Sequence, residues 1–260
     1  MNIVNSLKII SYVVYYNLLI FKKKILNETI NFTIWGAIST FVTGTLLVKS
    51  TTTQFATVQF CGVIANVGLW VSFHEIVDFI TDIENKKRLF YNLSIPLSSY
   101  LFFVSKVIFY IIRFSILTLL LTIIFKIILS HIISFESISL LKFLAIIITT
   151  NAFYGSWIIF ISSIIKKSQH LGNLFGRIQF PLWFMGGFQF SWVTLYQSNK
   201  VLAYIDLLNP ILYINEGFKN AILNREGILS FAHLILVITL FSMLLFHVGY
   251  RRLKKQLDFI

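Results

Sequence analysis

His74, Glu75 and Asp78 come closest in this sequence to the spacing of a catalytic motif. In the metalloprotease motif H-E-x-x-H, two histidines one helical turn apart bind zinc and the glutamate acts as a general base. Here an aspartate replaces the second histidine, and no nearby sequence supplies a third ligand. We therefore expect no metal site, but an ionisable cluster near the end of an apolar segment, where low dielectric makes partners necessary.

Two basic residues in the next apolar segment, Lys106 and Arg113, are charges of the opposite sign. They are seven residues apart, which places them on roughly one face of a helix. An arginine that faces lipid costs about 2.5 to 3.5 kcal/mol even on the lenient insertion scale, so Arg113 should face other helices or a polar cavity. A structural ion pair is the first interpretation of these charges, and coupling to substrate or nucleotide state is the alternative.

Other catalytic motifs are missing from the sequence. Without a G-x-x-x-x-G-K-[ST] phosphate loop, the chain is not expected to hydrolyse ATP itself. There is no G-x-S-x-G elbow and no Cys/His cluster, and the single cysteine, Cys61, lies in an apolar run. We expect a chain that is not an enzyme and binds no cofactor of its own.

Composition indicates which elements position these residues. Hydrophobic residues make up 57% of the 260, charged residues only 12%, and the mean hydropathy is +0.82. The net charge of +12 is gathered in short basic clusters beside apolar runs, a pattern of anchors on anionic membrane lipids rather than of nucleic-acid binding. The sequence predicts an all-α polytopic membrane protein.

Six apolar segments are close to the roughly 20 residues that cross a hydrocarbon core. They cover residues 30–48, 56–79, 99–125, 143–165, 171–190 and 228–250. When successive segments cross the membrane in alternating directions, 13 Lys and Arg residues fall on one side of the membrane and 6 on the other. Because positive residues are enriched on the cytoplasmic side, both termini are expected in the cytoplasm. No repeat or linker divides the chain, and residues 1–260 are predicted to form one membrane domain.

Residues 3–21 precede these segments and mix Lys8 with a short apolar stretch. The stronger basic cluster, Lys22 to Lys24, comes after the stretch and no small-residue cleavage site follows, which does not fit a signal peptide. The pattern predicts an amphipathic helix at the cytoplasmic interface, and a poorly structured membrane-skimming tail is the alternative.

Residues 181–223 are neither a clean span nor an ordinary loop. Pro181 and the pair Gly186-Gly187 interrupt an aromatic stretch, so a helix is expected to end in this region. Beyond it, tyrosines alternate with leucine and isoleucine, and Asn209-Pro210 marks a turn. We expect residues 191–226 to form an extracytoplasmic segment of short re-entrant or interfacial helices between the fifth and sixth spans.

This region resembles the end of an ABC-2 type transporter permease, where L-N-P-hydrophobic-x-Y-x-x-E-G-hydrophobic-K/R follows a proline-broken fifth span. The matching residues are Leu208, Asn209, Pro210, Tyr213, Glu216, Gly217, Phe218 and Lys219, with Lys219 in place of the more usual arginine.

The loop over residues 82–98 is similar to the coupling helix of the same family, which docks on the ATPase. The matching residues are Glu84, Leu89, Leu93, Pro96 and Leu97, while the usual Gly-Thr is absent. The alternative is that the basic residues 86–88 merely anchor this loop at the lipid headgroups.

The resemblance implies a permease subunit of an ATP-driven exporter in a bacterial plasma (inner) membrane. It would act as a homodimer with ABC ATPase subunits that are separate chains and hold the ATP. Closure of the ATPases would push residues 82–98 and open a path along the second and fifth spans. The residues implied for the path or outward gate are Arg177, Pro181, Gly186, Gly187, Asn209, Pro210, Tyr213 and Glu216.

The resemblance also brings the second and fifth spans together, which suggests a partner for Arg177. This residue follows Gly172-x-x-x-Gly176, a small-residue face suited to close helix packing, and lies about as deep as Glu75. We predict a Glu75–Arg177 ion pair, with Lys106 competing for the carboxylate. Without that pair, Arg177 is expected to face the translocation path, where it could contact an anionic headgroup.

Two other classes of function stay open. A membrane-embedded, lipid-handling enzyme would need His74, Glu75 and Asp78 with His170 or Arg177, a set without a recognised spacing. An ion-coupled secondary transporter would usually show repeats with broken helices in both halves, whereas only one half is broken here. The aromatic residues between positions 183 and 196 suit a membrane interface with any cargo.

Overall fold

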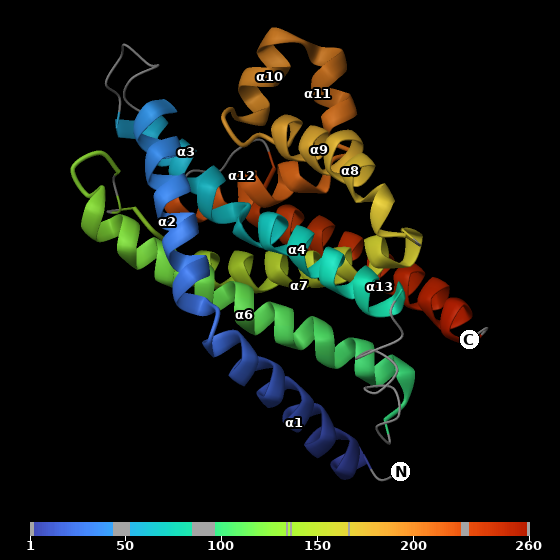
Figure 1. Ribbon diagram of the computed structural model, residues 1–260. Coiled ribbons are helices and arrows are strands. Elements are labelled where there is room, and N and C mark those ends of the chain that lie inside the picture. Colours follow the sequence, from blue (N-terminus) through green and yellow to red (C-terminus); the bar gives the residue numbers. More distant parts are fainter. Residues whose placement is uncertain are drawn as a thin grey trace.

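The computed structural model describes residues 3–43, 53–84, 97–133, 135, 137–165, 167–224 and 229–258. Every regular element in these ranges is a helix, and Figure 1 shows their arrangement. The helices are α1 (Ile3–Lys22), α2 (Ile25–Phe41), α3 (Thr53–Ala65), α4 (Val67–Glu84), α6 (Ser99–Ile128), α7 (Leu140–Ile164), η2 (Ser168–His170), α8 (Leu171–Leu174), η3 (Phe175–Gln179), α9 (Phe180–Met185), α10 (Trp192–Ser198), α11 (Lys200–Asp206), α12 (Pro210–Leu223) and α13 (Phe231–Asp258).

Four helical stretches within these ranges are long and apolar enough to cross a membrane. They are Phe55–Glu84, which joins α3 to α4, Ser99–Ile128, Leu140–Ile164 and Phe231–Gln256. The other two expected spans have a different form: α2 contains 17 described residues, and residues 171–185 form three short helical pieces. The all-helical, multi-span class is thus confirmed.

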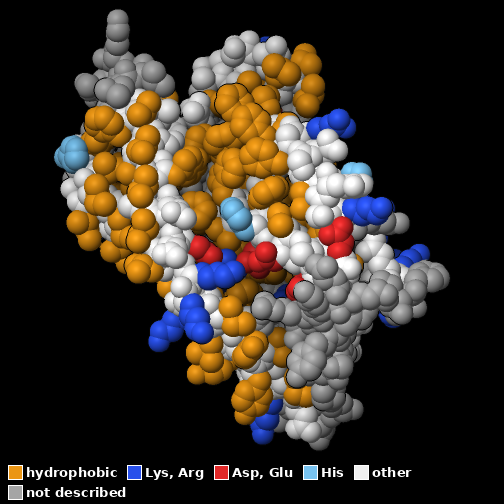
Figure 2. All heavy atoms as spheres, viewed as in Figure 1, with side chains coloured by type: hydrophobic (Ala, Val, Ile, Leu, Met, Phe, Trp, Pro, Cys, Tyr) orange, Lys and Arg blue, Asp and Glu red, His pale blue; other side chains and the backbone are white. Residues whose placement is uncertain are grey.

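Helix α7 lies at the centre of the bundle, and α4, α6, α12 and α13 pack around it. Its sequence is apolar on nearly every side, which is typical of a helix buried by neighbours rather than exposed on one face. A continuous core of buried side chains runs from α3 and α4 through α6 and α7 to α12. Figure 2 shows how much apolar surface remains outside this core, with acidic and basic side chains gathered in a band across it.

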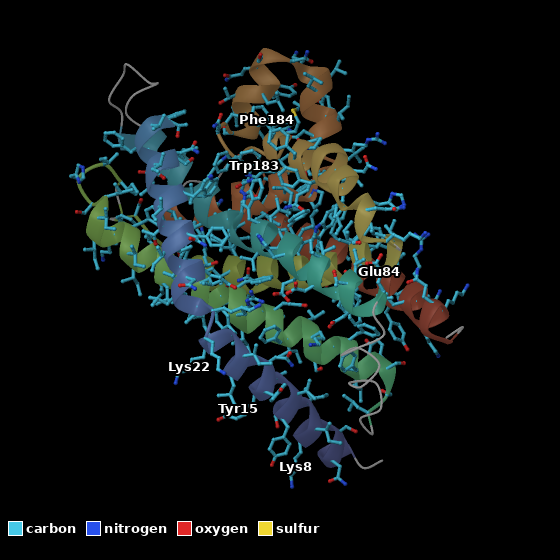
Figure 3. All side chains as sticks on the ribbon, in the orientation of Figure 1. Lys8, Tyr15, Lys22, Glu84, Trp183 and Phe184 are labelled. Atoms are coloured by element: carbon cyan, nitrogen blue, oxygen red, sulfur yellow. The ribbon has the colours of Figure 1, made fainter. Side chains whose placement is uncertain are left out.

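The N-terminal helix α1 ends at the basic cluster, as predicted from the sequence. It packs against α6 and buries Val14 and Phe21, while its tyrosines at positions 12, 15 and 16 are exposed. Lys8, Tyr15 and Lys22 project away from the bundle (Figure 3). Both chain ends lie on the lower side of the molecule in Figure 1, and α10 and α11 form a helical hairpin at the top.

Helix α12 follows this hairpin and returns into the bundle, where most of its side chains are buried. It packs against α3, α7 and α13. Of the short helices expected over residues 191–226, α12 is therefore a buried element rather than a surface helix. Its position decides the geometry of the candidate site.

Candidate functional site

The predicted fifth span is a helical stretch with one wide turn and a sharp end. Helix α8, the π-turn η3 and α9 follow one another without a break. Pro181 has no N–H and its ring crowds the carbonyl group of Arg177, so a wider turn before it relieves the clash. The helix passes through Pro181 and ends at Gly186 and Gly187, where Gly187 has a φ of +76°, a conformation that glycine adopts without strain.

Helix α12 holds the end of α9 through two asparagines. The Asn209 Nδ2 atom donates to the Leu182 carbonyl at 2.9 Å, while Asn209 Oδ1 accepts from the Ile211 N–H at 3.0 Å and caps α12. Six residues further along the chain, Asn215 Nδ2 donates to the Gly186 carbonyl at 2.7 Å. The Leu182 carbonyl also accepts from the Gly186 N–H at 3.0 Å, whereas the Gly186 carbonyl lies beyond the last residue of α9 and takes its bond from Asn215.

Lys219 completes this set of contacts. Its Nζ atom donates to the Gly187 carbonyl at 2.8 Å and also to the Phe190 carbonyl, and the residue is only 6% exposed. A buried cation is favourable beside carbonyl groups at a helix C-terminus because the helix dipole is negative there. We define the α9–α12 junction as Asn209, Asn215 and Lys219 with the carbonyl groups of Leu182, Gly186, Gly187 and Phe190.

Two more residues of the sequence motif fix the path of the chain around this junction. Glu216 pairs with Lys219 at 3.0 Å and accepts from the Trp192 N–H at 3.2 Å, which ties α12 to the start of α10. The Tyr213 hydroxyl donates to the Leu207 carbonyl at 2.8 Å. The motif residues Asn209, Tyr213, Glu216 and Lys219 thus each hold a backbone group, which is a structural role that sequence reasoning did not assign to them.

Asp206 lies beside the junction and is 4% exposed. One carboxylate oxygen accepts from Asn209 Nδ2 at 3.1 Å, and the other makes no hydrogen bond within the described residues. Burial disfavours the charged form and raises the pKa of Asp206 to about 6, although the bond from Asn209 opposes the shift.

A second buried joint separates α3 from α4 at Asn66. The Asn66 Nδ2 atom donates to the Gly62 carbonyl at 2.7 Å and to Asn215 Oδ1 at 2.9 Å, so the joint is bonded directly to the α9–α12 junction. Other side chains donate to carbonyl groups on either side of it, Tyr154 to Ala65 at 2.9 Å and Gln179 to Leu69 at 3.1 Å. Residues from α7, η3 and α12 therefore compensate for the interruption within a long apolar stretch.

The intramembrane charges form an ion-pair cluster centred on Arg113. Its guanidinium pairs with Glu28 of α2 at 2.6 Å and with Glu75 of α4, and Tyr110 donates to Glu75 at 3.2 Å. Arg113 itself is 4% exposed. The prediction that Arg113 faces the bundle with a structural partner is confirmed. The predicted Glu75–Arg177 pair was wrong, because Arg113 on the adjacent helix occupies the Glu75 carboxylate.

The other charges of this group have separate positions. Lys106 does not take the Glu75 carboxylate and donates to Asn17 Oδ1 of α1 at 3.0 Å. Asp78 is exposed on α4. Arg177 is exposed on η3 and forms no ion pair with any residue that the structure describes. No described atom lies within 4 Å of a Cβ placed on Gly172 or Gly176, so the small-residue face is open in the single chain.

Of the predicted coupling residues, Glu84 ends α4 at the far end from Asn66. Its Oε1 atom accepts from the Ser168 N–H at 3.0 Å, which links α4 to the start of the fifth segment. Figure 3 shows Glu84 at this edge of the molecule. Leu89, Leu93 and Pro96 lie outside the described residues.

Aromatic side chains connect α2, α4 and α9. The Trp183 ring lies 5.2 Å from that of Trp70 and 4.7 Å from that of Phe188, and Trp35 contacts both Trp70 and Phe188 at about 6 Å. Phe184 is 51% exposed next to Trp183 (Figure 3). This face of the fifth segment is apolar and does not present the polar groups that a catalytic site would need.

Sequence reasoning missed four residues that the structure brings into these clusters: Glu28, Asn66, Gln179 and Asn215. Each is a polar residue inside or beside an apolar run, and Glu28 is the only acidic residue before Glu75. That placement was the available signal, because a buried polar group needs a partner. Among the described residues, no group of three His, Cys, Asp or Glu side chains is arranged to hold a metal ion.

The fold and these contacts define a multi-span helical membrane protein in which buried polar side chains hold a broken segment. The chain belongs to the ABC-2 type transporter family, whose model matches residues 17–223, from within α1 to the end of α12. It is therefore a transporter permease with no catalytic activity of its own. No curated protein and no solved structure matches the chain.

Proposed function

We propose that this chain is the permease subunit of an ATP-driven ABC-2 type exporter, and that it forms the translocation path as a homodimer coupled to separate ATPase subunits. The observation that carries the proposal is the family match over residues 17–223, which includes the α9–α12 junction built from the motif residues. ATP is held by the partner subunits, since this sequence has no phosphate loop.

The proposed membrane arrangement has six spans with both termini in the cytoplasm. The predicted segment over residues 30–48, which overlaps α2, is one of the two spans beyond the four long ones, and the stretch from α8 to α9 is the other. The charge asymmetry of 13 to 6 supports this orientation. Helix α1 then lies at the cytoplasmic interface, and the α10–α11 hairpin lies outside.

The proposed coupling route begins at residues 82–98 and enters the bundle through α4. Glu84 supports this route because it joins α4 to Ser168 at the start of the fifth segment. Movement at this end reaches Asn66, which is bonded to Asn215 in the α9–α12 junction. The ATPases can shift the permease from one conformation to another only if residues 82–98 interact differently with the two ATPase states.

The open face of the fifth segment supports the proposed dimer. Gly172 and Gly176 have free space around them, and Phe180 and Phe184 are 42% and 51% exposed. A second copy packed here would place Arg177 at or near the path. In this arrangement the α9–α12 junction acts as the outward gate, because its side chains fix the position at which α9 ends.

Co-purification is the direct test. The tagged chain is isolated from its native membrane in mild detergent, and the associated proteins are identified by mass spectrometry. We expect an ABC ATPase in a one-to-one ratio with this chain, and ATP hydrolysis in the isolated complex. Quantitative recovery of the chain without an ATPase would overturn the proposal.

A further inference from the structure

A cavity of about 790 Å³ lies between α1, α4 and α6. Its lining residues include Asp78 and Asp82 of α4, which are acidic, and Lys24 and Lys106, which are basic. Charged side chains of both signs also meet on the face shown in Figure 2. A cavity with both signs of charge fits a ligand that itself carries both.

The acidic side of the cavity follows from helical spacing. Glu75, Asp78 and Asp82 all line it because positions i, i+3 and i+7 share one face of α4. Glu75 is already engaged by Arg113 and Tyr110, whereas Asp78 and Asp82 form no ion pair within the described residues. These two carboxylates can therefore accept hydrogen bonds from a primary ammonium group.

The basic side has a buried donor besides the two lysines. Arg113 lines the cavity, and its Nε atom is buried without a hydrogen-bond partner among the described residues, although both terminal nitrogens are bonded to glutamates. A phosphodiester group would complement the ammonium groups of Lys24 and Lys106. Lys106 is held toward the cavity by its bond to Asn17 of α1.

The outer wall is amphipathic rather than polar. Tyr12 and Tyr16 of α1 line the cavity while remaining 71% and 65% exposed, and Ile9 and Ile20 lie on the same wall. Tyrosine side chains of this kind are favoured at the level of lipid headgroups. A ligand seated among the charges can thus extend apolar chains along α1, which a small soluble zwitterion cannot do.

We propose that this cavity binds one phospholipid with a zwitterionic headgroup that ends in a primary amine, its amine at Asp78 and Asp82 and its phosphate at Lys24, Lys106 and Arg113. The site includes no residue of the fifth segment and does not depend on pairing with an ATPase. A lipid bound in this cavity would contact both α1 and the bundle, so the position of α1 would depend on the lipid.

The test is native mass spectrometry of the purified chain after exchange into phosphatidylethanolamine or phosphatidylglycerol with identical acyl chains. We expect one retained phosphatidylethanolamine per chain and about tenfold weaker retention of phosphatidylglycerol. Soluble glycerophosphoethanolamine should not displace it. Equal retention of the two lipids, or displacement by the soluble headgroup, would refute the proposal, and this comparison needs no variant that could fail to fold.

Variants then locate the site. The double change Asp78→Asn and Asp82→Asn should reduce retention of phosphatidylethanolamine about tenfold and remove the preference over phosphatidylglycerol. Lys24→Gln should weaken retention of both lipids. Matched controls are Glu84→Gln, which keeps its acceptor for Ser168, and Lys23→Gln, which is exposed but does not line the cavity. Lipid retention that is equal in all of these variants would place the lipid elsewhere.

Discussion

The side-chain amide of Asn215 donates to the Gly186 carbonyl at 2.7 Å, and its oxygen accepts from Asn66 at 2.9 Å. One buried asparagine therefore joins the end of α9 to the joint between α3 and α4. Both of its partners are fully or nearly fully enclosed by protein, so water cannot replace the bonds.

The change Asn215→Leu should therefore destabilise the protein by about 1 to 3 kcal/mol, since it removes the side-chain donor from the Gly186 carbonyl and the acceptor from one N–H of the Asn66 amide, which keeps its bond to Gly62. The measurement is the unfolding midpoint of the purified protein in detergent. Asn173→Leu, at an exposed position on α8, is the control and should leave the midpoint unchanged. Equal midpoints for both variants would show that the Asn215 bonds do not contribute.

Removal of Arg113 should be the most damaging change in the ion-pair cluster. Arg113→Gln leaves Glu28 and Glu75 without their cation, and breaking a buried pair in this way costs about 3 to 5 kcal/mol. Glu28→Gln combined with Arg113→Gln should lose less stability than the sum of the single changes in a double-mutant cycle. Strict additivity would mean that the pair contributes no coupling energy, and Arg177→Gln, an exposed arginine, serves as the control.

Asp206 should make stability depend on pH between about 4 and 6. Its folded-state pKa is raised to about 6 from a usual value of 3.8, so in this window the folded chain holds a proton that the unfolded chain releases. Stability therefore falls as pH rises through the window and is constant with respect to this group above it. Unfolding midpoints across this range should lose that slope in Asp206→Asn and keep it in Asp82→Asn; a stability that rises with pH through Asp206 would contradict the assignment.

The proposed orientation predicts which side of the membrane reacts with a thiol reagent. A cysteine at Ser198, exposed at the end of α10, should react with an impermeant maleimide added outside intact cells, and a cysteine at Ser94 should react only after the membrane is opened. The native Cys61 is buried, and labelling of the unchanged protein gives the background signal. The reverse pattern would invert the topology.

The coupling proposal predicts that residues 82–98 are needed for the ATPase. Leu89→Asp with Leu93→Asp should release the ATPase from the purified complex or uncouple ATP hydrolysis from transport, because charges replace the apolar contacts of a docking segment. Membrane insertion should be normal. Leu202→Asp, on the α10–α11 hairpin, is the control on the proposed opposite side. Unchanged association and transport would leave the loop as a headgroup anchor.

The long helices could be predicted from the sequence because length and hydropathy are local properties. The segments expected at residues 99–125 and 143–165 are observed as Ser99–Ile128 and Leu140–Ile164, and α1 ends within one residue of the expected position. The glycine pair that ends α9 was also visible, since its effect on a helix depends only on neighbouring residues.

Partners across the bundle could not be predicted in the same way. Counting residues from the end of a span gives depth but not which side of the helix faces a neighbour, and this is why Glu75 was assigned to Arg177 instead of Arg113. Asn66 and Asn215 are 149 positions apart, so nothing in either local sequence indicates their contact. The motif around Asn209 and Lys219 did not indicate which carbonyl groups these side chains hold.

In the proposed coupling route, α4 would act as a lever that pivots at Asn66. The helix has 18 residues beyond the joint, which corresponds to about 27 Å at 1.5 Å per residue. A rotation of about 10° at Asn66 would sweep the Glu84 end through about 5 Å on this arm length. The same rotation moves the side-chain amide of Asn66, which lies at the pivot, by only a fraction of that distance. A displacement of about 5 Å at the Glu84 end would thus become a much smaller displacement at the Asn66–Asn215 contact, on the scale of a single hydrogen bond.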